Sequence, residues 1–173
     1  MKKFLLVFLL ALFAVPYVFA TSMVKITRIT DTIHIKLPNG EMMPYKSIDE
    51  LPELVYGAKI LASGGTAEVK LFNTVNITLE KNQGILLLKN PITRALEISK
   101  LETRSKNPNI KAWLAGYASA TFGADSKVTF LERYPSIFFG VKKGEAIVNG
   151  IEGRVYTLTI GEQYEAKQNI VGD

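Results

Sequence analysis

Hydrophobic and polar residues alternate with a period of two along much of this chain, and turn sequences interrupt the alternation at short intervals. Alternating stretches cover residues 33–37, 67–71, 75–79 and 156–160, and short apolar runs cover residues 85–88 and 146–148. The accompanying turn sequences are Pro38-Asn39-Gly40, Phe72-Asn73-Thr74, Asn82-Gln83-Gly84, Asn90-Pro91, Asn149-Gly150 and Gly161-Glu162. A period of two sends every second side chain to the same face of a strand, so one face enters a core and the other meets water. The sequence therefore predicts an all-β fold of eight or more short antiparallel strands, arranged as a β-sandwich, a jelly roll or a short β-solenoid.

Few signals in the sequence indicate helices. Ser47 and Glu50 have the spacing of a capping box, but Pro52 limits any helix there to about one turn. Residues 92–119 fit either strands or a helix, so at most one or two short helices are expected. Because no linker rich in Gly, Ser or Pro divides the chain, residues 21–173 are predicted to form a single domain.

The N-terminus resembles an export signal. Lys2 and Lys3 precede an unbroken apolar run over residues 4–15, and the segment ends in a small residue, Ala20. This order predicts a signal peptide over residues 1–20, cleaved between Ala20 and Thr21. The alternative is an uncleaved anchor, which would be the chain's only contact with a membrane. Cleavage is favoured because Pro16 breaks the run, and the mature chain is then expected to be periplasmic or secreted.

Composition excludes several kinds of chemistry. The chain has no cysteine, which excludes disulfides, thiolate catalysis and cysteine-based metal centres. Its single histidine, His34, is predicted to lie on the polar face of a strand, away from any serine motif or carboxylate cluster. The acidic residues show no spacing typical of paired catalytic carboxylates or of a calcium loop. We therefore expect a protein that is not an enzyme and that has no cofactor and no metal.

The net charge of +5 is concentrated in one region. Residues 89–111 contain six basic side chains and only two acidic ones, Glu97 and Glu102. This window is either a solvated, lysine-rich surface or a site for an anionic glycan or headgroup. Nucleic acid is not expected as a partner of an exported chain.

Aromatic residues crowd the next region, between Trp113 and Phe139. Large rings there either fill a core or line an interface beside the basic window. Together the two regions give a candidate partner surface of Lys100, Arg104, Lys106, Lys111, Trp113, Tyr117 and Tyr134.

Several of these stretches resemble the FecR-like domain family, named for the regulator of iron-dicitrate transport. A strand and glycine turn at residues 33–40 precede a Leu-x-x-Gly-x-x-Ile step at residues 54–61. A small-Gly-x-Ala-x-Val-x-Leu element is matched at residues 64–71, and the closing elements at residues 141–148 and 158–166. The resemblance implies an extracytoplasmic β-rich module for sensing or scaffolding, without catalytic residues. Family members also carry a cytoplasmic anti-sigma segment, which the three residues before the apolar run do not supply, so we expect a stand-alone exported FecR-like domain.

The leading hypothesis is a non-enzymatic envelope protein that acts by contact with another envelope protein, through edge strands or through the basic and aromatic region. A second hypothesis is a carrier that binds lipid or polysaccharide in the groove of a β jelly roll. A third, a hydrolase with an unrecognised carboxylate pair, is the least favoured. The first predicts a packed interior with an exposed apolar patch on the rim, the second an elongated apolar cavity, and the third two acids close together in a cleft.

Overall fold

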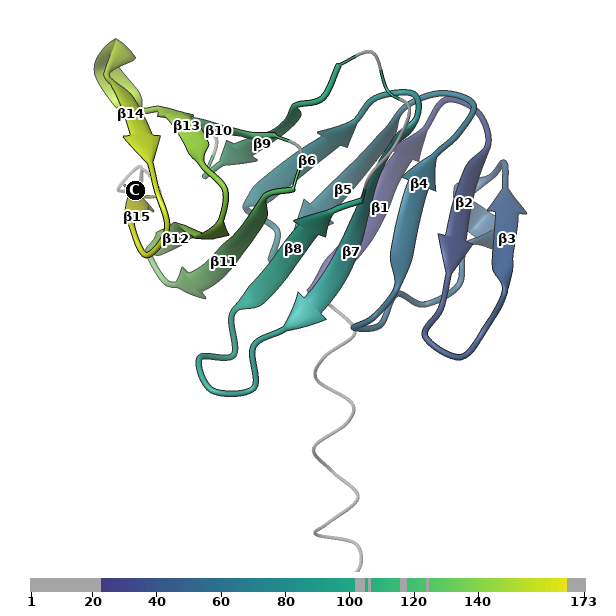
Figure 1. Cartoon of the computed structure of the whole chain (residues 1–173). Coiled ribbons are helices and arrows are strands. Elements are labelled where there is room, and N and C mark those ends of the chain that lie inside the picture. The colour runs from purple at the N-terminus through teal and green to yellow at the C-terminus, as the bar shows by residue number, and fades with distance from the viewer. Residues whose placement is uncertain (1–22, 102–104, 106, 116–117, 124, 168–173) are drawn as a thin grey trace, which may run out of the picture.

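The computed structural model describes residues 23–101, 105, 107–115, 118–123 and 125–167. In this range the chain forms two antiparallel sheets packed against each other, a β-sandwich (Figure 1). Of the architectures that the sequence left open, the sandwich is the one observed. The proposed cleavage position at Ala20 and Thr21 lies outside the described residues.

The seven-stranded sheet has the order β1-β5-β6-β9-β10-β13-β14 and the eight-stranded sheet the order β15-β12-β11-β8-β7-β4-β2-β3. The first sheet consists of β1 (Val24–Ile29), β5 (Ala67–Leu71), β6 (Val75–Leu79), β9 (Ile110–Leu114), β10 (Ala118–Phe122), β13 (Ala146–Asn149) and β14 (Val155–Leu158). The second consists of β2 (Ile33–Lys36), β3 (Met42–Tyr45), β4 (Lys59–Ala62), β7 (Gln83–Lys89), β8 (Leu96–Lys100), β11 (Lys127–Arg133), β12 (Ser136–Lys143) and β15 (Gln163–Lys167). Two short 3-10 helices, η2 (Ile48–Glu50) and η3 (Ile151–Gly153), are also described.

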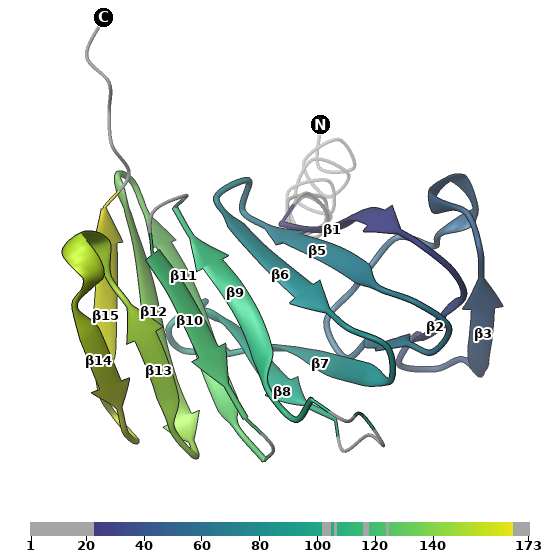
Figure 2. The ribbon, with the colours of Figure 1, turned by 90° about the horizontal axis from the view of Figure 1, so that it is seen from above.

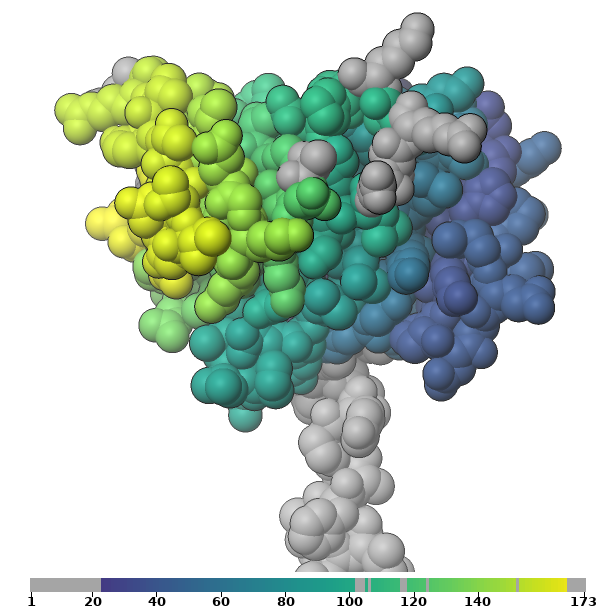
Figure 3. All heavy atoms as spheres, viewed as in Figure 1, coloured from purple at the N-terminus to yellow at the C-terminus, as the bar shows by residue number. Residues whose placement is uncertain are grey.

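From β5 onward the chain adds strands in hairpin pairs that alternate between the sheets. The pairs β5–β6, β9–β10 and β13–β14 enter the seven-stranded sheet, while β7–β8 and β11–β12 enter the other. Each pair lies beside the previous pair of its own sheet, so the sandwich extends in one direction along the sequence (Figure 2). As a result the earliest strands form one end of the molecule and β12 to β15 form the other (Figure 3).

The predicted alternation is borne out by burial. In β5 the side chains of Ala67, Val69 and Leu71 are buried, and the residues between them are half-buried. The same pattern holds in β6 and β9, so the inward faces of both sheets form one hydrophobic core. Burial of alternate apolar side chains is the main force that holds the sheets together.

Three phenylalanines fill the middle of this core. Phe122 of the seven-stranded sheet and Phe139 of the eight-stranded sheet have ring centres 6.5 Å apart, and Phe130 lies 5.2 Å from Phe139. All three side chains are at most 1% exposed. These rings therefore belong to the core, whereas Trp113 and Tyr134, from the same aromatic region, are 44% and 74% exposed.

The turn between β5 and β6 has an unusual residue. Phe72 and Asn73 both have positive φ angles, 57° and 79°, and the amide of Thr74 donates to the carbonyl of Leu71 at 3.1 Å. Three residues, 72–74, connect the paired Leu71 and Val75, and the two positive φ angles together with the Thr74–Leu71 hydrogen bond make this a tight hairpin connection. Phenylalanine is unfavourable there, but its half-buried ring packs against the core, which offsets the backbone cost.

The structure corrects two sequence predictions. Gln83 does not belong to a turn, since the turn is Lys81-Asn82 and β7 begins at Gln83, which is fully buried. Ile160 does not continue the last alternating strand, since β14 ends at Leu158 and Ile160 is 67% exposed in the following turn.

Residues 92–119, which fit either strands or a helix by sequence, form strands in the part that the structure describes. Residues 92–119 include β8, β9 and the start of β10. The predicted helix after Ser47 is a single 3-10 turn, η2, in which the Ser47 hydroxyl accepts a hydrogen bond from the Asp49 amide at 3.3 Å. No helix in the described part of the chain has the length and apolar character needed to cross a membrane.

Candidate interaction surface

On the central strands β6, β9 and β10, the outward face of the seven-stranded sheet carries short polar side chains around one aromatic ring. Trp113 on β9 lies opposite Asn76 of β6 and Ser119 of β10. Two residues earlier on β9, Lys111 lies opposite Thr78 and Thr121. Together these six residues, Asn76, Thr78, Lys111, Trp113, Ser119 and Thr121, are named the Lys111–Trp113 face.

Lys111 and Trp113 contact each other. Residues two apart on a strand share a face, and here the Lys111 Nζ lies 4.2 Å from the centre of the Trp113 ring. Trp113, the only tryptophan of the chain, has 44% of its surface exposed. The pair therefore presents a cation and a large apolar ring together to solvent.

A polar hollow begins at the Lys111 end of this face. A pocket of about 330 Å³ is lined by Thr78, Glu80, Gln83, Asn107, Asn109, Lys111 and Thr121. A second pocket, of about 310 Å³, shares Asn109 and Thr121 and continues to Gly144, Glu145 and Ile147. Most of the lining residues carry hydrogen-bonding or charged groups, so the hollow can accept polar groups of a partner.

Gln83 holds the wall of this hollow in place. Its amide nitrogen donates to the carbonyls of Asn107 and Asn109 at 3.0 and 2.8 Å, and its amide oxygen accepts from the Glu80 backbone at 2.9 Å. Asn107 in turn donates to the Glu80 carboxylate at 3.1 Å. The segment that leads into β9 is thus fixed to the start of β7, which fixes the position of Lys111.

Lys100 also contributes to holding the segment before β9 in place. Its Nζ donates to the carbonyl of Pro108, so it helps to hold the same segment. Partial burial lowers the pKa of the Lys100 amine, and the charge of Asp125 opposes that change. Lys100 therefore supports the neighbourhood of Lys111 from the eight-stranded sheet, in addition to any contact of its own with a partner.

The basic window does not form one patch. Lys89 lies 5.4 Å from the centre of the Tyr56 ring, and Arg94 lies in the β7–β8 turn with a φ of 58°. β8 separates this turn from Lys100 by about 15–20 Å at ~3.3 Å per residue. The described basic residues of this window thus lie in two groups, at opposite ends of strand β8.

The remaining candidate residues are dispersed or outside the described range. Tyr134 lies in the turn between β11 and β12, on the other sheet from Trp113. Arg104, Lys106 and Tyr117 are outside the described residues. Of the seven candidates, the structure brings Lys111 and Trp113 together and places Lys100 behind the segment next to them.

His34 lies on the outward face of β2, as the sequence predicts, but it has a partner. Its Nδ1 is 2.7 Å from the Ser63 hydroxyl, which donates to the carbonyl of Thr32 at 3.0 Å. In the described residues no three His, Cys, Asp or Glu side chains are grouped so as to hold a metal ion.

Sequence reasoning did not identify the polar neighbours of Trp113. Asn76, Thr78 and Thr121 occur in ordinary alternating stretches, and only the pairing of β6, β9 and β10 brings them together. The one available signal was the outward position of the polar residues in each stretch.

Comparison with known protein families, curated proteins and solved structures finds no match to this chain. The resemblance to FecR-like domains therefore stays a prediction from the sequence.

Proposed function

We propose that this protein is a non-enzymatic, exported binding or scaffold module of the bacterial cell envelope, FecR-like in kind, that acts by protein–protein contact. The Lys111–Trp113 face is its contact surface. The observation that carries the proposal is the 44% exposed tryptophan, which has a lysine Nζ 4.2 Å from the centre of its ring and short polar side chains on the neighbouring strands.

The composition of this face is typical of an interaction site. Tryptophan is enriched among residues that dominate binding energy, because a large ring buries much area and loses little side-chain entropy. The short polar side chains around it, Asn76, Thr78 and Thr121, suit a rim that forms hydrogen bonds. The strands beneath hold Trp113 in place, since β9 is paired on both sides.

The alternative, a carrier of lipid or polysaccharide, is less well supported. It requires a long apolar groove, whereas the inward side chains of both described sheets are packed together in one core. The apolar pocket beside β1, lined by residues of β1 and of the segment 48–54, has a volume of about 280 Å³. This pocket is confined to β1 and that segment and does not run along the sandwich as a long groove would.

Affinity capture from an envelope extract tests the proposal. Mature protein and the variants Trp113→Ala and Lys111→Glu are immobilised and the captured proteins are compared. Met43→Ala is the control, because Met43 is 51% exposed on β3, an edge strand of the other sheet. We expect the native protein and Met43→Ala to capture the same protein, and Trp113→Ala to lose it.

Two results would overturn the proposal. One is capture that is unchanged by Trp113→Ala and Lys111→Glu. The other is stoichiometric lipid or glycan in the purified protein, detected by mass spectrometry, which would favour the carrier function.

A further inference from the structure

The sandwich has four edge strands, and they differ in how they are protected. β1 and β14 are the edges of the seven-stranded sheet, and β3 and β15 are the edges of the eight-stranded sheet. An edge strand offers unpaired N–H and C=O groups, and proteins usually block unwanted pairing there with charges, proline or a covering segment.

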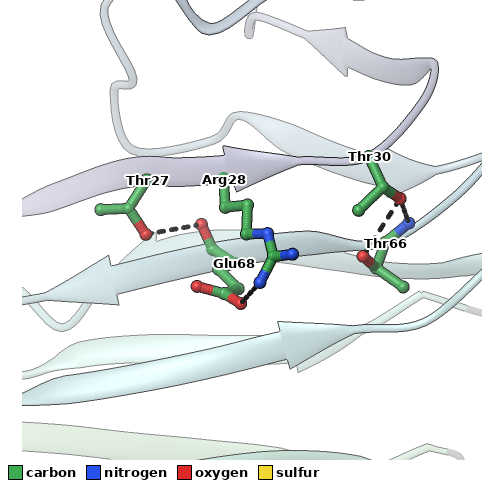
Figure 4. Close-up of polar contacts among 5 residues, drawn as sticks. All are labelled: Thr27, Arg28, Thr30, Thr66 and Glu68. Carbon is green, nitrogen blue, oxygen red and sulfur yellow. Dashed lines mark hydrogen bonds and ion pairs between the residues drawn. The ribbon is translucent and has the colours of Figure 1, made fainter.

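Three of these edges carry such protection. β1 contains Lys25 and Arg28, and Arg28 pairs with Glu68 at 3.5 Å (Figure 4). The segment around η2 also packs against β1. β3 contains Pro44, which has no N–H to donate. β15 contains Glu165 and Lys167.

In the part of the chain that the structure describes, β14 carries none of these protections. Its sequence, Val155-Tyr156-Thr157-Leu158, has no charged residue and no proline. Apolar side chains around it are exposed, among them Val155 at 63%, Ile160 at 67% and Ile151 at 48%. In Figure 1 the strand lies at the outer end of the molecule.

The pairing of β14 with β13 shows which of its backbone groups point outward. The amide of Gly150 donates to the carbonyl of Arg154 at 2.8 Å, and Tyr156 and Leu158 lie opposite Val148 and Ala146 in the same register. In an antiparallel ladder, hydrogen-bonded and non-bonded pairs alternate. The N–H and C=O groups of Val155 and Thr157 therefore point away from β13, toward the open edge.

We propose that β14 pairs in antiparallel orientation with β14 of a second copy of this chain. Centred on Tyr156, the pairing places Val155 of each copy opposite Thr157 of the other, so that all four outward groups of each strand find partners. No charge meets a like charge, since the strand has none. In this register Arg154, directly before β14, lies near the turn between β14 and β15 of the second copy. That turn contains Glu162, whose carboxylate accepts from the Thr159 backbone amide at 2.6 Å.

A closed symmetric dimer is favoured over an open head-to-tail polymer. Joining β14 of one copy to β1 or β3 of the next would place it against charged side chains or against a proline. Self-pairing uses the one edge without these features twice, and the assembly closes after two copies. The Lys111–Trp113 face lies on the central strands β6, β9 and β10, so this inference is independent of the proposed function.

Sedimentation velocity of the purified mature protein over about a hundredfold range of concentration tests the dimer. We expect a monomer–dimer equilibrium, weakened at least about tenfold by Val155→Lys and by Thr157→Pro. Both changes are at outward, exposed positions of an edge strand, so the fold is retained, which circular dichroism verifies. Met43→Lys, on exposed β3, is the matched control and leaves the dimer unchanged.

Cross-linking locates the contact. Because the chain has no cysteine, Val155→Cys introduces a single thiol, which a short bis-maleimide joins between two copies only if their β14 strands are close. We expect a covalent dimer from Val155→Cys and none from Met43→Cys. A native protein that is monomeric throughout, a dimer that survives both β14 changes, or a series of ever larger species would each overturn the proposal.

Discussion

Glu97 on β8 and Lys127 on β11 form an ion pair of 2.8 Å on the outward side of the eight-stranded sheet. The Glu97 side chain is only 9% exposed, and its other carboxylate oxygen accepts from the side-chain amide of Asn90 at 2.8 Å. Both oxygens of a nearly buried carboxylate are thus satisfied, and the contact joins the β7–β8 turn to two strands of the sheet. A buried charge with all its partners is costly to disrupt from one side.

Lys127→Met is expected to lower the free energy of unfolding by about 1–3 kcal/mol, because it leaves the Glu97 carboxylate without its counter-charge. Adding Glu97→Gln to Lys127→Met is expected to recover part of that loss. Arg28→Met is the matched control, since its partner Glu68 is 43% exposed and 3.5 Å away, and it is expected to cost less than about 1 kcal/mol. Urea unfolding measures all of these values, and equal losses for the two single variants would contradict the prediction.

Acid stability is expected to depend on Glu97. Burial, the largest single influence, raises the pKa of its carboxyl, but hydrogen bonds from Lys127 and Asn90 and the nearby lysine charges together outweigh it, so the pKa lies below the usual 4.5. A lowered pKa in the folded state stabilises the fold above the unfolded-state pKa, and that contribution is lost as pH falls through the folded-state value. Thermal unfolding measured from pH 7 to pH 3 is therefore expected to show a smaller loss below about pH 4.5 for Glu97→Gln than for the native protein. Parallel curves for the two proteins would exclude this role.

Gln83→Leu is expected to destabilise the protein by about 2–3 kcal/mol, because it removes the fully buried amide that donates to the carbonyls of Asn107 and Asn109. Hydrogen exchange of the amides from Asn109 to Lys111 is expected to become faster at the same time. Gln163→Leu, at an exposed position of β15, is the control and is expected to change neither measurement. Unchanged exchange in Gln83→Leu would show that Gln83 does not hold this segment.

Two neighbouring phenylalanines of β12 test the sandwich. Phe139 is fully buried between the sheets, whereas Phe138 points outward and is half-buried, with the Arg133 guanidinium 5.9 Å from its ring. Phe139→Ala is expected to cost about 3–5 kcal/mol and Phe138→Ala about 1 kcal/mol, measured by denaturant unfolding. Similar costs at both positions would mean that the strand does not have one inward and one outward face.

Tryptophan fluorescence reports on the proposed contact surface directly, because Trp113 is the only tryptophan. The Lys111 ammonium beside the ring attracts anions, so iodide is expected to quench the emission more strongly than caesium at low ionic strength. Lys111→Glu is expected to reverse that order, while Lys36→Glu on β2 is expected to leave it unchanged. If the order is the same in all three proteins, Lys111 does not lie over the ring.

Much of the local structure could be predicted from the sequence. The spacing of Ala67, Val69 and Leu71 gave both the position of β5 and its buried face. The prediction went wrong where a polar residue is buried and where an apolar one is exposed. Gln83 looks like a turn residue because its type is polar, yet it is buried at a place where three backbone groups need hydrogen-bond partners. Ile160 looks like a core residue, but the turn at Gly161, with a φ of 91°, ends the strand before it.

The candidate surface was only partly predictable for a similar reason. Trp113 and Phe122 are both aromatic residues in strands of the same sheet, yet one faces solvent and the other the core. Lys100 and Lys111 occur in one basic stretch, yet one is held by the Pro108 carbonyl and the other lies over Trp113. Charge and residue type along the chain do not distinguish these cases, because the distinction depends on the register of strands that pair across long intervals.

The amino-acid sequence alone determined that this protein is built of short strands and which residues of each strand share a face. That information is local, since side chains two residues apart on an extended chain point the same way whatever surrounds them. Only the tertiary structure decided which strands lie side by side, that β6, β9 and β10 share the face around Trp113, and that β14 is left as an edge. Those choices depend on how all the apolar faces can be buried at once between two sheets, and no single stretch of the chain carries that information.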